Sequence, residues 1–448
     1  MVNRQDGELG RAVFLLGGKG TRLGLVDRPK PMVEIDGKPL LERLVESVAG
    51  QGFRDMLFLC GYRADAIRAH FGDGARFGVR IEYVVEDYPL GTAGAVRAVA
   101  ARLSAPFLVF YGDVLFDIDI AKFVAYAAAK GGCGTLYTHP NDHPFDSDLV
   151  EVDGSGRIVA FHVKPHGSAN HANLASAAVY YLTPEALAHV PSDAASDWGR
   201  DVFPSIVSAG GALYSYRGSE YLKDVGTPDR LARAKRALRA GLPARRSYRA
   251  RQRAIFLDRD GVLNEEIDGV YAADQLKLLE SAAAGVKAIN QKGLLAICVT
   301  NQPGLAKGFF DFATLADVHR RLDVMLAQEG AYLDDIYVCP HHPERGFEGE
   351  VATLKIDCEC RKPQPGLLKQ AAEFHNIDLV SSCIIGDRVI DIAAGAAVGA
   401  KGYLVNNRDP ADAMAVEALQ GTVVDGGLQA ALQAIFEPHD QTRGSAAC

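Results

Sequence analysis

The chain has 448 residues, which is longer than one hydrophobic core usually grows, so we expect two domains. Hydrophobic residues make up 48% of the chain and charged residues 23%, a composition typical of soluble globular proteins. The formal net charge is -8 without a basic run, which argues against a nucleic-acid partner, and no apolar stretch approaches the roughly 18 residues of a membrane span. We therefore expect a cytoplasmic protein that acts on small molecules. Its oligomeric state stays open.

Short apolar and β-branched runs alternate with helical patterns along the chain. This alternation predicts two doubly wound, Rossmann-like α/β domains built on parallel sheets. The expected strands are residues 12–16, 56–60, 81–85 and 107–111 in the first half, and 254–257, 294–299 and 383–385 in the second.

The expected division of the chain follows from composition. A first domain over residues 8–237 is followed by an Arg-rich linker over 238–252, a second domain over 253–436 and a flexible tail over 437–448. The linker has no apolar period, although its start could be the end of a helix running from Pro228.

A glycine-rich turn, GGKGTRL, follows the first expected strand directly. Its backbone amides can approach phosphate oxygens, and Arg22 with the downstream Lys30 can neutralise a triphosphate. The same glycines also suit a plain strand-to-helix turn, so they do not decide the function alone. The residues expected to bind the nucleotide here are Gly17, Gly18, Gly20 and Thr21.

With RPKPM at residues 28–32, this turn resembles the signature of sugar-nucleotide pyrophosphorylases, and later segments match in the order of that family. The resemblance implies a nucleoside loop, a magnesium pair and a lysine on the sugar phosphate. These roles fall to Gly91, Thr92 and Gly94, to Asp113 and Asp224, and to Lys164, respectively. Val163 stands where the family usually has Glu, which puts the sugar contacts in question.

These groups suit the transfer of a nucleotidyl group. A sugar 1-phosphate attacks the α-phosphorus of a nucleoside triphosphate and expels pyrophosphate, so negative charge must be screened in the transition state. Magnesium and the fixed cations Arg22, Lys30 and Lys164 would supply that screening. No protein nucleophile is needed.

The second half opens with FLDRDGVLN, in which an apolar strand delivers Asp258 and Asp260 to the carboxyl end of a sheet. This pair resembles the first motif of the haloacid dehalogenase superfamily. By that resemblance, Asp258 is the nucleophile that takes a phosphoryl group, and Asp260 is the general acid that protonates the leaving alkoxide and later activates water. A turn or capping pair is the plainer alternative.

Three further segments match later motifs of this superfamily. They imply groups that hold the phosphoryl oxygens, two cations, and a magnesium site shared by Asp258, the backbone carbonyl of Asp260 and Asp387. Asp391 would either support that site or cap the helix that it opens. The segments supply Thr300, Asn301 and Gln302, then Arg361 and Lys362, and last Asp387 and Arg388.

Two pairs of metal-binding side chains lie between these motifs, in CPHHP and CEC. Clustered cysteines in a reducing compartment indicate metal rather than disulfides. Three thiolates and one imidazole form a closed tetrahedral set, which predicts structural zinc. The expected ligands are Cys339, His341, Cys358 and Cys360; His342 competes with His341, and only the spacing from Cys339 favours the latter.

CPHHP, CECRKP, LDRDG and TNQ together resemble the branch of the superfamily that contains heptose bisphosphate phosphatases and histidinol-phosphate phosphatases. The first half, with FDIDI, resembles heptose 1-phosphate guanylyltransferases, whose close relatives use mannose or glucose 1-phosphate. A phosphatase that removes the 7-phosphate of D-glycero-D-manno-heptose 1,7-bisphosphate leaves a 1-phosphate for a nucleotidyltransferase, with GTP as the favoured nucleotide. Two alternatives stay open: the same chemistries on another phosphate ester, and a sugar-nucleotide-binding scaffold with one degenerate half.

Overall fold

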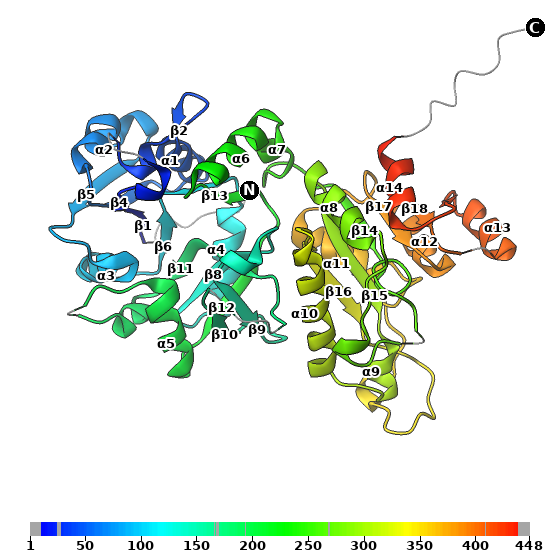
Figure 1. Ribbon diagram of the computed structural model, residues 1–448. Coiled ribbons are helices and arrows are strands. Elements are labelled where there is room, and N and C mark those ends of the chain that lie inside the picture. The colour runs from blue at the N-terminus through cyan, green and yellow to red at the C-terminus, as the bar shows by residue number, and fades with distance from the viewer. Residues whose placement is uncertain are drawn as a thin grey trace, which may run out of the picture. The chain divides into compact units, whose positions relative to one another are not determined.

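The computed structural model of the chain describes residues 10–24, 28–164, 166, 170–192, 194–267, 269–407 and 409–437. These residues divide into two compact units: the first holds most of the chain up to Ala250, and the second holds the chain from Arg251. Each unit is a β-sheet with helices packed on both faces (Figure 1). The predicted domain start at residues 8 and 9, and the tail over 438–448, lie outside the described residues.

The first unit is built on a nine-stranded sheet of mixed direction. Four strands run parallel in the order β5-β4-β1-β6, and β11 pairs antiparallel with β6. Beyond β11 the sheet continues to β9 and β10 on one path and to β8 and β12 on another. The strands are β1 (Ala12–Leu16), β4 (Asp55–Cys60), β5 (Arg80–Val85), β6 (Phe107–Tyr111), β8 (Gly134–His139), β9 (Leu149–Val152), β10 (Ile158–His162), β11 (Ala175–Leu182) and β12 (Leu213–Arg217).

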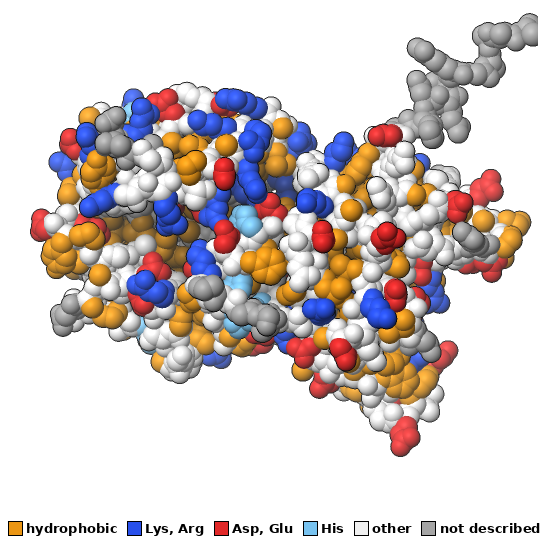
Figure 2. Space-filling view, in the orientation of Figure 1, with side chains coloured by type: hydrophobic (Ala, Val, Ile, Leu, Met, Phe, Trp, Pro, Cys, Tyr) orange, Lys and Arg blue, Asp and Glu red, His pale blue; other side chains and the backbone are white. Residues whose placement is uncertain are grey.

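Helices cover both faces of this sheet, and two short ladders stand apart from it. Lys and Arg side chains gather over α6 and α7 on the face shown in Figure 2. The helices are α1 (Leu40–Gly50), α2 (Ala64–Phe71), α3 (Gly91–Arg97), α4 (Ile120–Lys130), α5 (Phe203–Ser208), α6 (Pro228–Arg239) and α7 (Leu242–Arg245). The ladders pair β2 (Glu34–Ile35) with β3 (Lys38–Pro39), and β7 (Val114–Phe116) with β13 (Leu222–Asp224).

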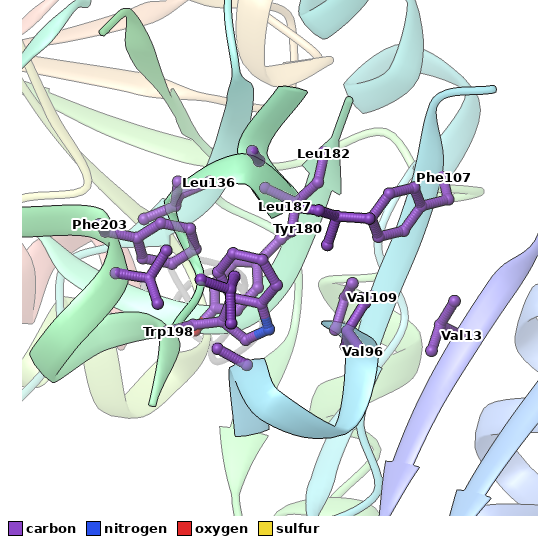
Figure 3. Close-up of a cluster of buried hydrophobic side chains, with 14 of the residues drawn as sticks. Val13, Val96, Phe107, Val109, Leu136, Tyr180, Leu182, Leu187, Trp198 and Phe203 are labelled. Atoms are coloured by element: carbon purple, nitrogen blue, oxygen red, sulfur yellow. The ribbon is translucent and has the colours of Figure 1, made fainter. Parts of the chain in front are cut away.

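Strand β1 is buried on both faces, because its side chains alternate between two apolar layers. Val13 belongs to the layer that contains Trp198 and side chains of α3 and α5 (Figure 3). Phe14 packs into the other layer, with ring-centroid distances of 5.2 Å to Phe58 and 5.3 Å to Phe110. Packing therefore fixes the end of β1, where the glycine-rich turn begins.

The second unit is built on a six-stranded sheet, entirely parallel, in the order β16-β15-β14-β17-β18-β19. Strand β14 lies between β15 and β17, so the segments that follow these three strands meet at the carboxyl edge of the sheet. The strands are β14 (Ala254–Leu257), β15 (Leu295–Asn301), β16 (Asp335–Cys339), β17 (Cys383–Gly386), β18 (Lys401–Leu404) and β19 (Thr422–Val423).

Two apolar layers enclose this second sheet. Leu257 of β14 belongs to the layer with α8, α10 and α14, and Phe256 to the layer with α11. The alternation buries the strand that carries the Asp258 motif on both faces. The helices are α8 (Ala282–Lys292), α9 (Pro303–Lys307), α10 (Phe312–Gln328), α11 (Gly366–His375), α12 (Val389–Ala396), α13 (Pro410–Ala418) and α14 (Leu428–Phe436).

The predicted fold class, two α/β units, is confirmed, but the first sheet is not parallel throughout. The alternation of strand and helix holds from β1 to β6 and is lost after β8. There β9 and β10 are joined by a short turn, which permits only antiparallel pairing. None of the described helices is both long enough and apolar enough to cross a membrane.

The segment predicted to be a linker, 238–252, instead packs on the first unit as far as Ala250. Helix α6 continues to Arg239, and α7 follows it. The buried Arg246 side chain donates a hydrogen bond from Nε to the Ser219 carbonyl at 2.9 Å, and the Tyr221 amide donates to the Arg246 carbonyl at 2.8 Å. Composition pointed to a linker because the segment is rich in arginine, yet Leu238 and Leu242 pack against an apolar cluster of the first unit and Arg246 is buried.

Candidate active sites

Lys30, Asp113 and Asp224, far apart in the sequence, meet beside the β7–β13 ladder. Strand β13 ends at Asp224, and the next amide, that of Val225, donates to the Asp113 carbonyl at 3.0 Å. Lys30 forms an ion pair with the Asp113 carboxylate. A Cβ atom on Gly226 would lie 2.8 Å from Asp224 Oδ1 and 3.2 Å from Lys30 Nζ, so a larger residue there would push on these side chains where they converge.

Arg230 and Asp146 extend this cluster, and no sequence motif pointed to either residue. Arg230 pairs with Asp224 through one guanidinium nitrogen and with Asp146 Oδ2 through the other, the latter at 2.7 Å. The backbone carbonyl of Asp146 also accepts a hydrogen bond from Lys164 Nζ at 2.7 Å. The lysine predicted to bind the sugar phosphate is thereby connected to the predicted magnesium carboxylates.

The first glycines of the nucleotide turn border this cluster. A Cβ atom on Gly18 would lie 3.9 Å from Lys30 Cδ, and one on Gly17 would lie 3.3 Å from Glu86 Oε2. Burial raises the pKa of Glu86, whose carboxylate accepts no hydrogen bond from the described residues. Glu86 is a third residue that sequence reasoning missed.

Other predicted residues of this site face solvent. Gly20 has a φ angle of 70°, which favours glycine, and it opens a short 3-10 turn in which the side chains of Thr21 and Arg22 are exposed. Val163 is 38% exposed. These side chains are accessible to an incoming substrate.

The predicted nucleoside loop is anchored to a distant segment of the first unit. Gly91 has a φ angle of 76°, and a Cβ atom there would lie 2.3 Å from the Ser196 carbonyl oxygen. The Thr92 hydroxyl donates to Asp197 Oδ2 at 2.6 Å and accepts from the Trp198 amide at 3.0 Å. The Gly94 amide donates to the Ser196 carbonyl at 3.3 Å. The Thr92 side chain and the Gly94 amide thus brace the loop against residues 196–198.

In the second unit, Asp258 and Lys362 form a buried ion pair at the end of β14. Lys362 Nζ lies 2.8 Å from Asp258 Oδ1 and 2.6 Å from Asp391 Oδ1, and it donates to the Val299 carbonyl at 2.8 Å. Burial raises the pKa of Asp258, and Lys362 opposes that shift. Burial would lower the pKa of Lys362, but Asp258 and Asp391 together raise it above its ordinary value. The ammonium group is therefore held charged against the carboxylate.

Three carboxylates converge here. Oxygen atoms of Asp258, Asp387 and Asp391 lie within 4.8 Å of one another. Asp387 Oδ1 is buried and has no hydrogen-bond partner in the described part of the chain. Burial, followed by Asp391 and Glu266, raises the pKa of Asp387 to about 6. This oxygen-only donor set with one unsatisfied carboxylate oxygen fits a hard divalent cation such as Mg2+.

The Asp260 carboxylate is held by donors from three residues. Arg259 NH2 lies 2.8 Å from each of its oxygens, and the amides of Asn264 and Gln302 each donate to it at 2.9 Å. Burial would raise the pKa of Asp260, but the Arg259 charge and these hydrogen bonds outweigh burial and lower it. The carboxylate is therefore oriented before any substrate binds.

The residues at the end of β15 support these groups. The Asn301 side chain accepts from the Lys362 amide and donates to the Lys362 carbonyl, both at 3.1 Å. Gln302 Nε2 donates to the Thr300 hydroxyl at 2.9 Å as well as to Asp260. Thr300, Asn301 and Gln302 therefore gather around the Asp258 cluster as predicted from their motif, with their side chains already engaged by other site residues.

Arg361, Asp391 and Arg388 lie around the edge of this cluster. Arg361 NH1 donates to the His341 carbonyl at 3.2 Å. Asp391 accepts from the Arg388 amide at 3.2 Å, so it caps α12 and pairs with Lys362 at the same time. The Arg388 side chain is exposed, and no ion pair connects it to the described carboxylates of the site.

The structure brings together Cys339, His341, Cys358 and Cys360 at the end of β16. Cys339 Sγ lies 3.6 Å from Cys358 Sγ, 3.3 Å from Cys360 Sγ and 3.9 Å from His341 Nδ1. A tetrahedral zinc ion with bonds of about 2.3 Å requires ligand separations of about 3.8 Å, so the set fits zinc. His342 lies outside it, edge-on to Phe347 with ring centroids 6.0 Å apart.

A pocket of about 570 Å³ adjoins this cysteine loop. It combines apolar and charged walls, and Lys362 of the Asp258–Lys362 pair is one of its lining residues. Its lining includes Pro343, Ile356, Asp357, Arg361, Lys362 and Gln364.

Comparison with known proteins agrees with this division into two sites. Residues 11–241 match the nucleotidyl transferase family, and residues 359–426 match a family of HAD-like hydrolases. Over 248 residues the chain is 33% identical to mannose-1-phosphate guanylyltransferase of Mycobacterium tuberculosis, covering 54% of this chain and 68% of the relative. Over 144 residues it is 41% identical to D-glycero-beta-D-manno-heptose-1,7-bisphosphate 7-phosphatase of Pasteurella multocida, covering 32% of this chain and 76% of the relative. The crystal structure of HddC from Yersinia pseudotuberculosis is 26% identical and covers 51% of this chain and 99% of its own, with a TM-score of 0.45.

Proposed function

Since this chain belongs to the nucleotidyl transferase family in its first half and to the HAD-like phosphatases in its second, it joins two enzymes, and we propose that they act in succession on one sugar. The phosphatase removes the 7-phosphate from D-glycero-D-manno-heptose 1,7-bisphosphate. The nucleotidyltransferase then transfers a nucleotidyl group, from GTP by preference, to the remaining heptose 1-phosphate and releases pyrophosphate. The product is an activated heptose for a surface polysaccharide such as lipopolysaccharide.

One observation carries this proposal: the relatives of the two halves have names that fit consecutive reactions. The relative of the second half is named for removal of the 7-phosphate from a heptose 1,7-bisphosphate. The relative of the first half is named as a guanylyltransferase for a sugar 1-phosphate. Removal of the 7-phosphate leaves a sugar 1-phosphate, so the product of one reaction has the functional group that the other uses.

The geometry of the second unit supports the roles proposed for its residues. Asp258 attacks the 7-phosphorus, the bond from phosphorus to the sugar oxygen breaks, and Asp260, once it has taken up a proton from solvent, protonates that oxygen. Asp260 then takes a proton from the water that releases phosphate from Asp258. Lys362, 2.8 Å from Asp258, balances the charge of both the nucleophile and the phosphoryl group, and Arg361 adds a second cation at the pocket wall.

The first unit supports a transferase that aligns two anionic substrates. Arg22 and Lys30 neutralise the triphosphate beside the glycine-rich turn, and Lys164 holds the sugar phosphate. The ion pairs of Lys30 with Asp113 and of Arg230 with Asp224 keep the two carboxylates neutralised until substrate and metal replace those partners.

We propose two metals with separate tasks. Mg2+ in each site would be held by carboxylates, Asp113 and Asp224 in the transferase and Asp258 and Asp387 with the Asp260 carbonyl in the phosphatase, and would supply positive charge to the phosphates. Zinc bound by Cys339, His341, Cys358 and Cys360 would be structural, because these four ligands leave no open coordination position. A cytoplasmic location follows from the need for nucleoside triphosphates.

Glu86 supports GTP as the favoured nucleotide. Its partly buried carboxylate lies beside Gly17 and is unsatisfied within the described chain. The N1–H and exocyclic N–H groups of guanine present two adjacent donors to a carboxylate, whereas adenine presents an acceptor in that place. We expect Glu86→Gln to reduce the kcat/KM ratio of GTP to ATP by about tenfold, as the loss of one charged hydrogen bond would. Glu34→Gln, at an exposed position, is the control; an unchanged ratio in Glu86→Gln would remove this support.

A substrate panel tests the proposal. The chain is supplied with Mg2+ and either anomer of heptose 1,7-bisphosphate, mannose 1,6-bisphosphate or histidinol phosphate, and phosphate release is measured. Heptose 1-phosphate, mannose 1-phosphate and glucose 1-phosphate are then offered with GTP, ATP, CTP and UTP, and pyrophosphate release is measured. We expect the heptose esters and GTP to give the highest kcat/KM.

Mannose 1-phosphate is the second candidate for the transferase, because it appears in the name of that half's relative. If mannose 1-phosphate exceeds heptose 1-phosphate by tenfold or more in the same assay, the two halves do not share a sugar. We also propose that the domains separate between Ala250 and Arg251, so residues 8–250 and 251–437 produced apart should each keep one activity.

A further inference from the structure

A fully buried arginine separates the two catalytic aspartates of the phosphatase. The Arg259 side chain is 0% exposed, yet its guanidinium contacts Asp260 rather than the neighbouring Asp258 carboxylate. Nε and NH2 both donate to Asp260, at 3.2 Å and 2.8 Å. A buried guanidinium must have each donor directed at a partner, so its orientation is determined by what its remaining nitrogen contacts.

That remaining nitrogen contacts a histidine from a different element. Arg259 NH1 lies 3.4 Å from Nε2 of His319, which projects from the middle of α10. Burial, followed by the Arg259 charge, lowers the pKa of His319 to about 3. The imidazole is therefore neutral at physiological pH and accepts a hydrogen bond without competing with Asp260 for the positive charge.

From this geometry we infer that His319 and Arg259 form a positioning unit that aims the Asp260 carboxylate at the leaving oxygen. His319 fixes the guanidinium, the guanidinium fixes one side of Asp260, and Asn264 and Gln302 fix the rest. Neither His319 nor Arg259 contacts the substrate in this scheme. The inference rests on the general acid-base role proposed for Asp260.

A positioning role has a consequence that a purely structural role lacks. Phosphoryl transfer from a sugar phosphate needs a proton for a strongly basic leaving oxygen, whereas p-nitrophenolate leaves without one. A misplaced Asp260 should therefore slow transfer from the sugar phosphate to Asp258 and leave transfer from p-nitrophenyl phosphate intact. Release of phosphate from Asp258 also uses Asp260, as the base for water, so this second step should be slow with either substrate. p-Nitrophenol should therefore appear as a burst.

The test compares His319→Leu, which removes the acceptor, with His319→Gln, which keeps one. Both are made in the full chain and assayed with Mg2+, using heptose 1,7-bisphosphate in steady state and p-nitrophenyl phosphate in rapid mixing. We expect His319→Leu to lower kcat for the sugar phosphate by about tenfold, a part of the factor that general acid catalysis contributes. The burst rate and amplitude should stay within about twofold of the parent, and His319→Gln should recover most of the lost kcat.

Two controls separate the possible failures. Asp317→Asn, at an exposed position on the same helix, should behave as the parent chain, and the burst amplitude reports the fraction of folded phosphatase sites. The inference would be overturned if His319→Leu and the parent turned over the sugar phosphate at the same rate. It would also be overturned if His319→Leu lowered kcat for the sugar phosphate and the p-nitrophenol burst rate by the same factor. If His319→Leu gives no burst, His319→Asn takes its place under the same criteria. Full turnover of the sugar phosphate by Asp260→Asn would instead overturn the proposed role of Asp260 itself.

Discussion

The two candidate sites hold their charged groups in opposite ways. In the phosphatase, the Lys362 side chain is 1% exposed and Asp391 is 0% exposed, and each charge has a fixed partner. In the transferase, the Asp224 side chain is 43% exposed and Asp146 61% exposed, and their partners are the long side chains of Arg230 and Lys164. The difference follows the chemistry, because one site must align its own nucleophile and the other must admit two anionic substrates and align them with each other.

Removal of the proposed nucleophile, Asp258, should have the largest effect and should separate the phosphatase from the transferase most clearly. We expect Asp258→Asn to lower phosphate release by about a thousandfold or more, because the amide that replaces the proposed nucleophile cannot take the phosphoryl group. Pyrophosphate release from heptose 1-phosphate and GTP in the same protein should be unchanged. A retained phosphatase rate would show that the buried pair is not the reaction centre.

Loss of the metal cluster should affect the stability of the second unit only. Cys358→Ser removes one of four ligands, and we expect it to lower the free energy of unfolding of that unit by at least about 3 kcal/mol, comparable to losing a structural cross-link. Thermal unfolding followed by calorimetry, with zinc content by atomic absorption, measures both. Cys133→Ser, outside the cluster, is the control. Full stability without bound zinc would contradict a structural role.

The transferase should depend on the cations that lie beside its glycine-rich turn. Lys30→Met removes the charge between the glycine-rich turn and Asp113, and we expect kcat/KM for GTP to fall by about a hundredfold. Lys38→Met, at a surface position with only carboxylates of α1 as partners, should have little effect. Steady-state pyrophosphate release checks both variants, and equal rates for them would place the nucleotide elsewhere.

A smaller effect should come from the raised pKa of Asp387. Between the ordinary value of 3.8 and about 6, the folded metal-free protein keeps a proton on Asp387 that the unfolded chain has lost. The contribution of Asp387 to stability therefore falls as the pH rises through this window, and Mg2+ should offset the loss once the carboxylate is ionised. We expect Mg2+ to raise the melting temperature of the second unit by a few degrees at pH 7 and much less at pH 5. The same rise at both pH values would contradict this account of the carboxylate cluster.

The site residues that were predicted best from the sequence are those at the ends of parallel strands. Asp258 and Asp387 each follow a strand of the second sheet, Thr300 lies next to the last residue of strand β15, and parallel pairing brings the three to one edge. The spacing of Cys339 and His341 likewise predicted which side chains would converge, and the structure places His341 rather than His342 in the group.

What the sequence did not predict depends on long-range contacts between side chains. Arg230 and Asp146 are 84 positions apart, and Thr92 and Asp197 are 105 apart, so no local pattern connects them. The antiparallel half of the first sheet and the folded segment up to Ala250 were missed for the same reason, since both depend on pairing partners elsewhere in the chain.

Succession of the two reactions is tested most directly by giving the full chain Mg2+, GTP and D-glycero-D-manno-heptose 1,7-bisphosphate, with each anomer in turn, and following the products by mass spectrometry. We predict that phosphate appears first, and that pyrophosphate and GDP-heptose follow with a lag that disappears when heptose 1-phosphate is supplied. Phosphate release without any sugar nucleotide, from either anomer, would contradict the claim that the two enzymes share one sugar.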